Sequence, residues 1–243
     1  MGACASRNET DIQVQKEIDH DKKSEARAHK LLLLGAGGSG KSTFFKQLKT
    51  IHGDGHSQRE KEGFKRQIYG QVIENMQILI RQCKLVTKAG SDETDSDSDN
   101  DERAENLRKV LSEEDIAEFK IDTEFDESCK YLLRLPNGSA AMDDTLAAHV
   151  KKLWTECAPI RSMFEHRNKI CVPDSTGYFF NAIDRIGQGN YVPENGDILL
   201  VRYRTTGMTE KEFRIGDANF KIHDVGGQRN ERKKWIHFFD GLF

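Results

Sequence analysis

The sequence predicts an α/β fold that is interrupted by an all-helical domain, and three stretches support this prediction. A short apolar run at 31–34 is typical of a strand buried on both faces, and it leads into a glycine-rich turn and a helical pattern. Residues 57–190 show helical periodicity. Strand-like alternation returns after Asp197. In a chain of 243 residues this order indicates that a helical domain is inserted within a strand-bearing one.

The glycine-rich turn carries the spacing G-x-x-x-x-G-K-S, formed by Gly35, Gly40, Lys41 and Ser42. This spacing is typical of a phosphate-binding P-loop, in which glycines let the backbone wrap around an anion and the next helix adds its positive end. Lys41 supplies a charge for the β- and γ-phosphates, and Ser42 supplies a hydroxyl ligand for Mg²⁺. A turn that binds nothing is the alternative, but the strand before it and the helix after it favour the P-loop. The helix is expected to bury one face, made of Phe44, Phe45, Leu48 and Ile51.

Composition excludes several other classes of protein. The net charge is −3, so nothing indicates a nucleic-acid partner. No apolar run approaches the ~20 residues that span a bilayer, and no secretory signal is present. The cysteines are odd in number and lack metal-site spacing, which favours reduced thiols: Cys4, Cys83, Cys129, Cys157 and Cys171.

The N-terminal residues fit the lipidation pattern M-G-x-x-x-S. Gly2 is a candidate for myristoylation and Cys4 for palmitoylation, and two lipids together anchor a protein stably to a membrane. An unmodified tail is the alternative. Residues 8–30 are polar on all sides, so either a partner-bound helix or a solvated linker fits them.

The stretch from 57 to 190 reads as a series of helices. The longest is expected from about Arg59 to Val86, with a core stripe of Phe64, Ile68, Val72, Met76, Leu79 and Cys83. Residues 91–102 carry no apolar side chain and no basic one, so we expect a disordered acidic loop over 91–106. Further helices are expected around Leu107, from Asp143 or Asp144 to Cys157, and after Pro173.

The final part of the chain reads as a hairpin followed by a polar turn. The segment 216–219 is expected to join two strands. The second strand ends at Asp224, and the glycines of Asp224-Val225-Gly226-Gly227-Gln228 follow it. An aspartate at this place is typical of the second carboxylate on the Mg²⁺ side of P-loop hydrolases, where it acts through water.

Three motifs together resemble those of heterotrimeric G protein α subunits. They are G-A-G-x-S-G-K-S-T at 35–43, R-x-R-T-T-G at 202–207 and D-V-G-G-Q-R-x-E-R-K-K-W at 224–235. The resemblance covers nearly the whole chain except the acidic loop, and it implies a Ras-like P-loop domain with an inserted all-α domain. The expected division is an N-terminal arm over 1–29, the first part of the Ras-like domain over 30–56, the helical insertion over 57–195 and the second part of the Ras-like domain over 196–243.

The resemblance implies a GTPase with roles assigned by position. Gln228 would orient the attacking water and Arg202 would stabilise the transition state, although a surface salt bridge is the alternative for Arg202. Ser42 and Thr205 would bind Mg²⁺ directly and Asp224 through water. The implied residues that bind GTP or GDP are Gly35, Ala36, Gly37, Gly38, Ser39, Gly40, Lys41, Ser42, Thr43, Asp174, Ser175, Leu199, Leu200, Val201, Arg202, Thr205, Asp224, Val225, Gly226, Gly227 and Gln228.

The resemblance also implies partners and a location. They are the βγ dimer, a G protein-coupled receptor, an effector, a GTPase-activating regulator and, through lipids, the cytoplasmic face of the plasma membrane. The surface that meets βγ would hold Met208, His223, Lys234, Trp235 and His237. The implied function is a GTP-hydrolysing molecular switch, and the alternative is a truncated form that binds βγ without hydrolysis.

The sequence departs from the family pattern at several places. Gly38 replaces a usual glutamate that pairs with the switch arginine, Leu200 replaces a usual arginine, and His223 replaces a large apolar residue. The sequence ends at Phe243, before the Asn-Lys-x-Asp guanine motif of the family. We therefore expect a C-terminally truncated form with an incomplete sheet and little discrimination between guanine and adenine.

Overall fold

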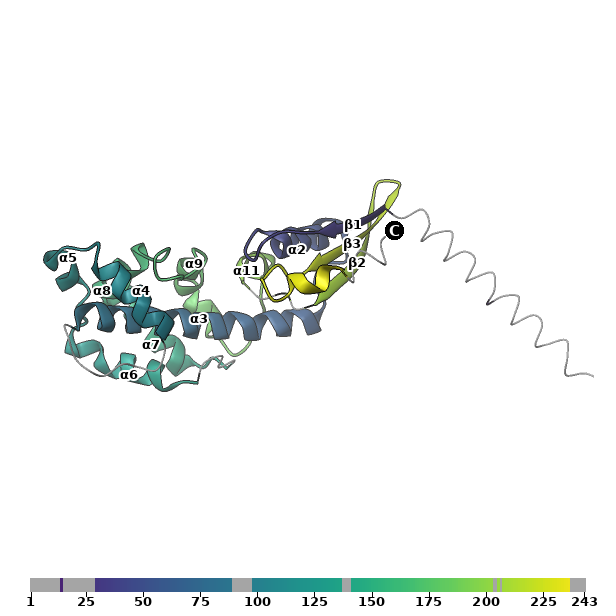
Figure 1. Ribbon diagram of the computed structural model, residues 1–243. Coiled ribbons are helices and arrows are strands. Elements are labelled where there is room, and N and C mark those ends of the chain that lie inside the picture. Colours follow the sequence, from purple (N-terminus) through teal and green to yellow (C-terminus); the bar gives the residue numbers. More distant parts are fainter. Residues whose placement is uncertain are drawn as a thin grey trace, which may run out of the picture. The chain divides into compact units, whose positions relative to one another are not determined.

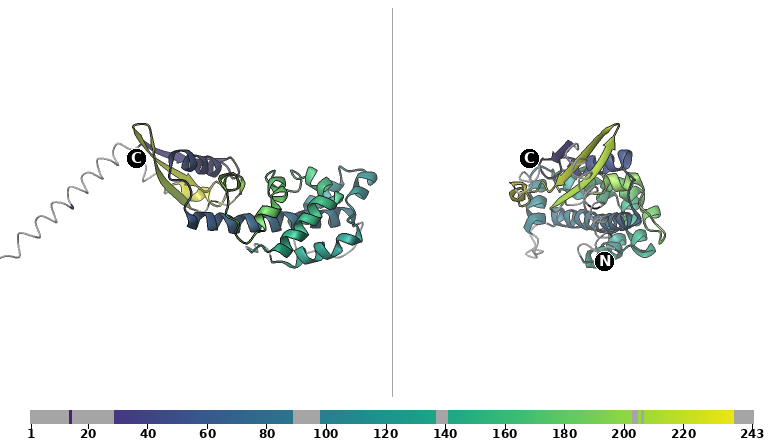
Figure 2. Two further views of the ribbon diagram at one scale, coloured as in Figure 1. Left: turned by 180° about the vertical axis from the view of Figure 1, so that it is seen from behind. Right: turned by 90° about the vertical axis from the view of Figure 1, so that its right-hand side faces the viewer.

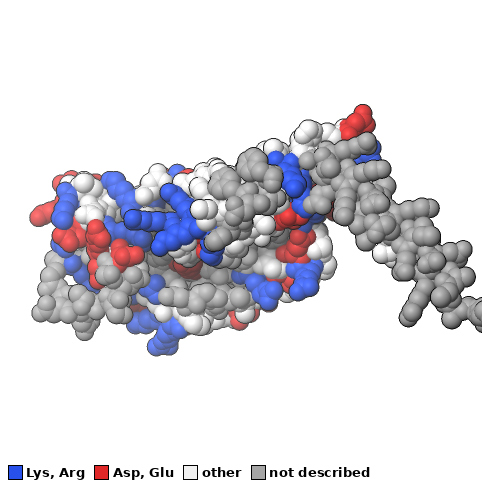
Figure 3. Space-filling view, turned by 45° about the vertical axis from the view of Figure 1, so that its right-hand side comes forward, with Lys and Arg blue, Asp and Glu red and all other residues white. Residues whose placement is uncertain are grey.

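The computed structural model describes residues 14, 29–88, 98–136, 141–202, 205 and 207–236. The chain divides into two compact units, one made of Met1–His56 with Arg204–Phe243 and the other of Ser57–Tyr203. We call the first the nucleotide unit, because it contains the motif at 35–43 that is predicted to bind a nucleotide, and the second the helical unit. Lys, Arg, Asp and Glu side chains are interspersed over the face in Figure 3, in keeping with the net charge of −3. None of the described helices is long and apolar enough to cross a membrane.

The nucleotide unit contains a three-stranded sheet of order β1-β3-β2 (Figure 1). Strand β1 (His29–Leu33) pairs in parallel with β3 (Ala218–Val225), which pairs antiparallel with β2 (Met208–Ile215). Ile215 lies opposite Ala218, so the hairpin turns at Gly216 and Asp217, and Gly216 has a φ of 61° that favours glycine. The predicted hairpin is therefore confirmed, and Figure 2 shows it from two further sides.

Helix α2 (Lys41–His52) packs on β2 and β3 and supplies one of the three buried side chains of a small core. Phe45, Phe213 and Ile222 are buried together, and the rings of Phe45 and Phe213 meet edge to face at 5.9 Å. The predicted burial is only partly correct, because Phe44 and Ile51 are exposed. Leu31 and Leu34 were expected inside a sheet, but each is 43% exposed, because β1 has one neighbouring strand among the described residues.

The helical unit is built on the long helix α3 (Gln58–Thr87). A capping box opens it: the Ser57 side chain accepts the Glu60 N–H, and the Glu60 carboxylate accepts the Ser57 N–H. The predicted core stripe is confirmed at Ile68, Val72, Met76, Leu79 and Cys83. The remaining elements are α4 (Ser98–Arg108), α5 (Glu113–Glu118), η1 (Thr123–Phe125), α6 (Asp126–Arg134), α7 (Asp144–Glu156), α8 (Ala158–Glu165), α9 (Thr176–Asn181), α10 (Ile183–Ile186) and α11 (Asn195–Leu200).

Helix α4 corrects the expected extent of the acidic loop. The loop was expected over 91–106, but the chain is helical from Ser98 onward. Ala104 and Leu107 are buried on the side of α4 that packs against α3, and the Asn100 carbonyl accepts a hydrogen bond from Gln82 at 3.0 Å. Two apolar residues one turn apart are thus enough to hold a mostly acidic helix on a neighbour. Residues 91–97 lie outside the described part of the chain.

The end of the helical unit also differs from the prediction. Strands were expected from Asp197 and a domain boundary after residue 195, but Asp197 lies in helix α11. The compact helical unit continues to Tyr203. The reason is a buried polar cluster around Asp197, described with the site below.

Candidate functional site

The P-loop connects the end of β1 to the start of α2. Gly38 and Gly40 have φ values of 81° and 87°, a conformation that glycine adopts at little cost, and Gly40 directly precedes α2. The Lys41 ammonium donates to the backbone oxygens of Gly35 and Ala36, each at 2.8 Å. The loop therefore curls around the Lys41 ammonium at the N-terminal end of a twelve-residue helix, the geometry that binds phosphates.

Three oxygen-bearing side chains meet beside this loop. The Ser42 hydroxyl lies 2.7 Å from the Thr205 hydroxyl and donates to Asp224 Oδ2 at 2.8 Å. The Thr205 hydroxyl donates to the same Asp224 oxygen at 3.5 Å. The parallel pairing of β1 with β3 sets Leu33 beside Asp224, so the end of β3 lies alongside the start of the P-loop. The sheet register thus brings together residues that are up to 182 positions apart in sequence.

The electrostatic environment of Asp224 suits a cation. Its carboxyl group is buried, and burial raises its pKa above the usual value, although the bond from Ser42 and the charge of Lys41 oppose this shift. Asp224 Oδ1 is buried and accepts no hydrogen bond from the described residues. Two hydroxyls and a carboxylate with one buried unpaired oxygen are hard oxygen donors of the kind that Mg²⁺ prefers. The side chains of Ser42, Thr205 and Asp224 therefore fit a Mg²⁺ ion.

The loop that follows β3 packs directly on the P-loop. A Cβ atom on Gly227 would lie 2.4 Å from the Gly35 carbonyl oxygen and 2.5 Å from Lys41 Nζ. A Cβ atom on Gly37 would lie 3.3 Å from Gln228 Cγ. Only a residue without a side chain fits at 227, because backbone meets backbone there. Gln228 is exposed beside the loop, so its amide is accessible to solvent.

The other predicted site residues belong to the helical unit. Leu199 and Leu200 lie at the end of α11, Val201 is buried, and the exposed Arg202 donates its backbone N–H to Gln71 Oε1 at 3.1 Å. Before α9, Asp174 accepts a hydrogen bond from Arg167 Nε at 2.5 Å, and the half-buried Ser175 is the N-cap residue. The structure thus brings the P-loop group together within one unit and places Arg202 and Asp174 in the other.

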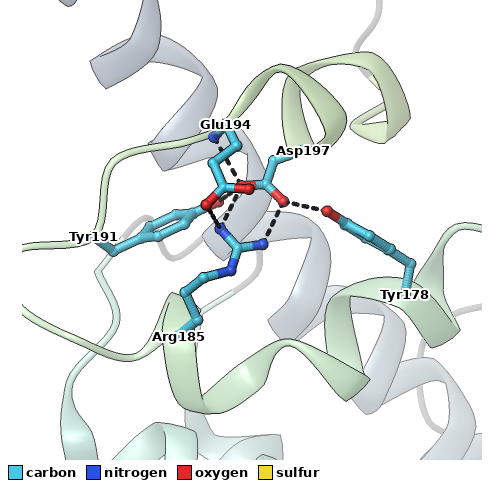
Figure 4. Close-up of polar contacts among 5 residues, drawn as sticks. All are labelled: Tyr178, Arg185, Tyr191, Glu194 and Asp197. Atoms are coloured by element: carbon cyan, nitrogen blue, oxygen red, sulfur yellow. Dashed lines mark hydrogen bonds and ion pairs between the residues drawn. The ribbon is translucent and has the colours of Figure 1, made fainter.

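Sequence reasoning missed a buried polar cluster that holds the start of α11 (Figure 4). The fully buried Asp197 accepts two hydrogen bonds from Arg185 at 2.8 and 2.7 Å. It also accepts the Tyr178 and Tyr191 hydroxyls at 2.8 and 2.9 Å and the Glu194 N–H at 2.9 Å. Burial alone raises the pKa of Asp197, but these hydrogen bonds outweigh burial and lower it to about 2. The partners follow no sequence period, so no sequence signal indicated them.

The predicted partner surface is only partly exposed. Met208 and Lys234 are exposed, but Trp235 is half-buried and donates its indole N–H to the Gly226 carbonyl at 2.9 Å. His223 was expected on the surface and is only 6% exposed, because it lies in the central strand β3. Burial lowers the pKa of His223, against the opposing effect of Glu210 at 3.3 Å.

Three predicted residues lie outside the described part of the chain. They are the lipidation candidates Gly2 and Cys4 and the partner candidate His237.

Comparison with known proteins identifies relatives over nearly the whole chain. A protein-family model described as G-protein alpha subunit matches residues 8–243. A guanine nucleotide-binding protein subunit alpha of Emericella nidulans is 33% identical over 237 residues, which cover 98% of this chain and 58% of that protein. A G-protein complex alpha subunit gpaA of Aspergillus fumigatus is 34% identical over the same share of each chain. The chain thus spans 58% of the length of these relatives.

Proposed function

The chain belongs to the G-protein α-subunit family, and from this premise we propose that it is a molecular switch that binds GTP and GDP and hydrolyses GTP. One observation carries the proposal. The side chains of Ser42, Thr205 and Asp224 meet beside the glycine-rich loop that holds the Lys41 ammonium, and this loop has the geometry of a phosphate-binding loop. Neither a purely structural glycine turn nor a surface cluster accounts for a buried carboxylate that faces two hydroxyls.

In the proposed site, one set of residues would bind the Mg²⁺ ion and another would bind the phosphates. The Ser42 and Thr205 hydroxyls would bind Mg²⁺ directly, and Asp224 would bind it through water. The ion would supply positive charge to the β- and γ-phosphates. Lys41 and the backbone N–H groups at the start of α2 would bind the phosphate oxygens. These residues together would bind the phosphates of a nucleotide with its metal.

Three further residues would act on the reacting phosphate. The Gly227 N–H would bind the γ-phosphate, and Gln228 would orient the attacking water. Arg202 would stabilise the negative charge that spreads over the γ-oxygens in the transition state, which lowers the barrier because the interaction strengthens there. These roles are those of the family, carried over by position. The close packing of Gly227 on the P-loop supports the role of Gly227 in this chain.

We further propose that the protein works on the cytoplasmic face of the plasma membrane with the partners of its family. The Aspergillus fumigatus relative is named as part of a G-protein complex, which supports a βγ partner for this chain. Met208, Lys234, Trp235 and His237 would take part in that contact, with receptor, effector and GTPase-activating regulator as further partners. Gly2 and Cys4 would carry the two lipids that stable anchoring requires.

A titration with a fluorescent guanine nucleotide tests the site. We expect Lys41→Ala and Ser42→Ala each to lower the affinity measured with Mg²⁺ by at least about tenfold, because each removes a group that binds the phosphates or the metal. Thr50→Ala is the matched control, since this hydroxyl also lies on α2 and donates only to the Lys46 backbone oxygen at 3.0 Å. Unchanged affinity in both site variants would contradict the proposal.

Single-turnover hydrolysis tests the catalytic roles. We expect Gln228→Leu and Arg202→Cys to slow hydrolysis by about 100-fold at unchanged nucleotide affinity, because both groups act mainly on the transition state. Arg59→Cys, at an exposed arginine near the start of α3, is the control. Tight binding without turnover by the unsubstituted chain would instead favour the alternative, a form that binds βγ without hydrolysis.

A further inference from the structure

We propose that Glu231 is a positioning residue: it joins the segment before β2 to the loop after β3 and thereby sets the place of the Thr205 hydroxyl. The inference rests on the proposed function and extends it, because Thr205 is a candidate Mg²⁺ ligand. Glu231 follows the site loop in sequence, and neither the P-loop pattern nor the metal ligands include it.

The carboxylate of Glu231 lies inside the nucleotide unit. The residue is 6% exposed, and its Oε2 accepts the Gly207 backbone N–H at 3.1 Å and the Lys234 ammonium at 2.9 Å. A buried carboxylate is stable only where such donors compensate for lost hydration. Lys234 is half exposed, so its ion pair contributes little. The bond to the Gly207 N–H ties the Glu231 carboxylate directly to the backbone before β2.

The same glutamate also packs on the loop after β3. A Cβ atom on Gly226 would lie 2.7 Å from Glu231 Cγ and 2.8 Å from its Cβ, so the stem of the side chain covers this glycine closely. The Glu231 N–H donates to the Gln228 carbonyl at 2.8 Å, and this turn holds the residue in place. Glu231 is thus in contact with the segment that carries Thr205 and with the loop that follows Asp224, two of the three segments that supply the candidate metal ligands.

Gly207 transmits this contact to Thr205. Its carbonyl accepts the Gly226 N–H at 3.1 Å, so both backbone groups of Gly207 are bound to the loop after β3 or to Glu231. The Thr205 carbonyl oxygen lies 2.7 Å from where a Gly226 Cβ would stand. Two residues before Gly207, the Thr205 hydroxyl lies 2.7 Å from that of Ser42. Releasing Gly207 therefore frees Thr205 to leave Ser42 and Asp224.

Hydrogen exchange of the ligand-free chain tests the contact directly. We expect Glu231→Ala to speed exchange of the Gly207 amide by about tenfold, the effect of losing a hydrogen bond to a charged acceptor. Glu231→Gln keeps an acceptor of the same length, so its exchange should stay close to that of the unsubstituted chain. Lys234→Ala, which removes only the exposed partner, should also leave it unchanged. Unchanged Gly207 exchange in Glu231→Ala would overturn the inference.

Nucleotide binding with Mg²⁺ and with a chelator tests the consequence. We expect Glu231→Ala to lower the affinity measured with Mg²⁺ by about tenfold and to leave the affinity without Mg²⁺ unchanged, with Glu231→Gln restoring most of the loss. An equal loss under both conditions would indicate a merely structural role and overturn the inference.

A second variant acts on the backbone at Gly207 itself. Gly207 has a φ of 74°, and nothing lies within 4 Å of a Cβ placed there, so Gly207→Ala introduces strain without a clash. It should reproduce the Mg²⁺-selective loss, and a normal Mg²⁺ dependence would count against the inference. If the unsubstituted chain binds no nucleotide, the proposed function fails, and the exchange experiment alone decides the role of Glu231.

Discussion

The helical unit and the nucleotide unit are stabilised by different means. Helix α3 alone buries twelve residues, nine of them apolar, whereas the apolar cluster of the nucleotide unit has three buried side chains among the described residues, Phe45, Phe213 and Ile222. Hydrophobic stabilisation scales with the apolar area removed from water, so the helical unit has far more of it. The nucleotide unit relies instead on polar contacts between distant segments, such as Ser42 with Asp224 and Gly207 with Glu231.

In the nucleotide unit, the contacts that stabilise the fold and the groups of the candidate site are largely the same. The polar contacts of the nucleotide unit lie at the candidate site, so the groups that would bind Mg²⁺ and phosphate also hold the unit together. A ligand that binds only the folded state adds stability that grows with the logarithm of its concentration once this exceeds Kd. We therefore expect nucleotide to stabilise the nucleotide unit far more than the helical unit.

The largest expected effect follows from removing a core side chain of the helical unit. Phe180 is fully buried, and Phe180→Ala should lower the free energy of unfolding of this unit by about 4 kcal/mol, through lost burial and a cavity. Denaturant unfolding followed by circular dichroism measures this change. Phe44→Ala, at an exposed phenylalanine of the nucleotide unit, should change stability by less than about 0.5 kcal/mol. If both substitutions lowered the free energy of unfolding by a similar amount, the proposed difference in hydrophobic stabilisation between the units would be wrong.

The next effect concerns the buried carboxylate of the helical unit. Asp197→Ala should cost about 3 kcal/mol, because it removes the buried acceptor of two tyrosines and leaves Arg185 with the more distant Glu194 carboxylate at 3.7 Å. The pKa of Asp197 is lowered to about 2 from 3.8, so its stabilisation is present above about pH 4 and is lost as the pH falls toward 2.

Unfolding across this pH range gives the check. The loss of stability between pH 4 and pH 2 should be smaller in Asp197→Ala than in the unsubstituted chain. Asp184→Ala is the control, because Asp184 forms an exposed ion pair with Lys151. Parallel pH profiles for Asp197→Ala and the unsubstituted chain would contradict the assignment.

The next prediction compares a glycine-to-alanine substitution in each unit, and we expect the two substitutions to have opposite effects. Gly227→Ala places a carbon against the Gly35 carbonyl and Lys41, and we expect a cost of about 2 kcal/mol, close to 30-fold in nucleotide affinity with Mg²⁺. Gly63→Ala, in α3 with nothing within 4 Å of the new carbon, should instead stabilise the helical unit slightly. Titration and unfolding of the two variants measure these opposite outcomes.

The smallest expected effect comes from removing an N-terminal capping box, either from α3 or from α5 of the helical unit. Ser57→Ala removes the capping box of α3 and should cost about 1 kcal/mol. Ser112→Ala removes the same motif from α5, which buries no residue, so helix fraying there should affect global stability less. Unfolding of the two variants tests the order, and an equal or larger loss at Ser112 would contradict it.

The sequence by itself determined the features that depend on near neighbours along the chain. The strand before the glycine-rich turn and the helix after it, the hairpin turn at Gly216 and the apolar stripe of α3 were predicted correctly, because each is a local pattern with its own period or turn chemistry. The motifs at 35–43, 202–207 and 224–235 together also indicated the family that the comparison found.

Only the tertiary structure decided which residues are buried and which unit they belong to. Ala104 and Leu107 hold an acidic helix on α3, and Asp197 keeps a segment that was expected to form strands within the helical unit. The burial of His223 and the exposure of Leu31 follow from the strand order of the sheet. These outcomes depend on partners far apart in sequence, and the energy of burying a side chain is set by the residues that surround it in space.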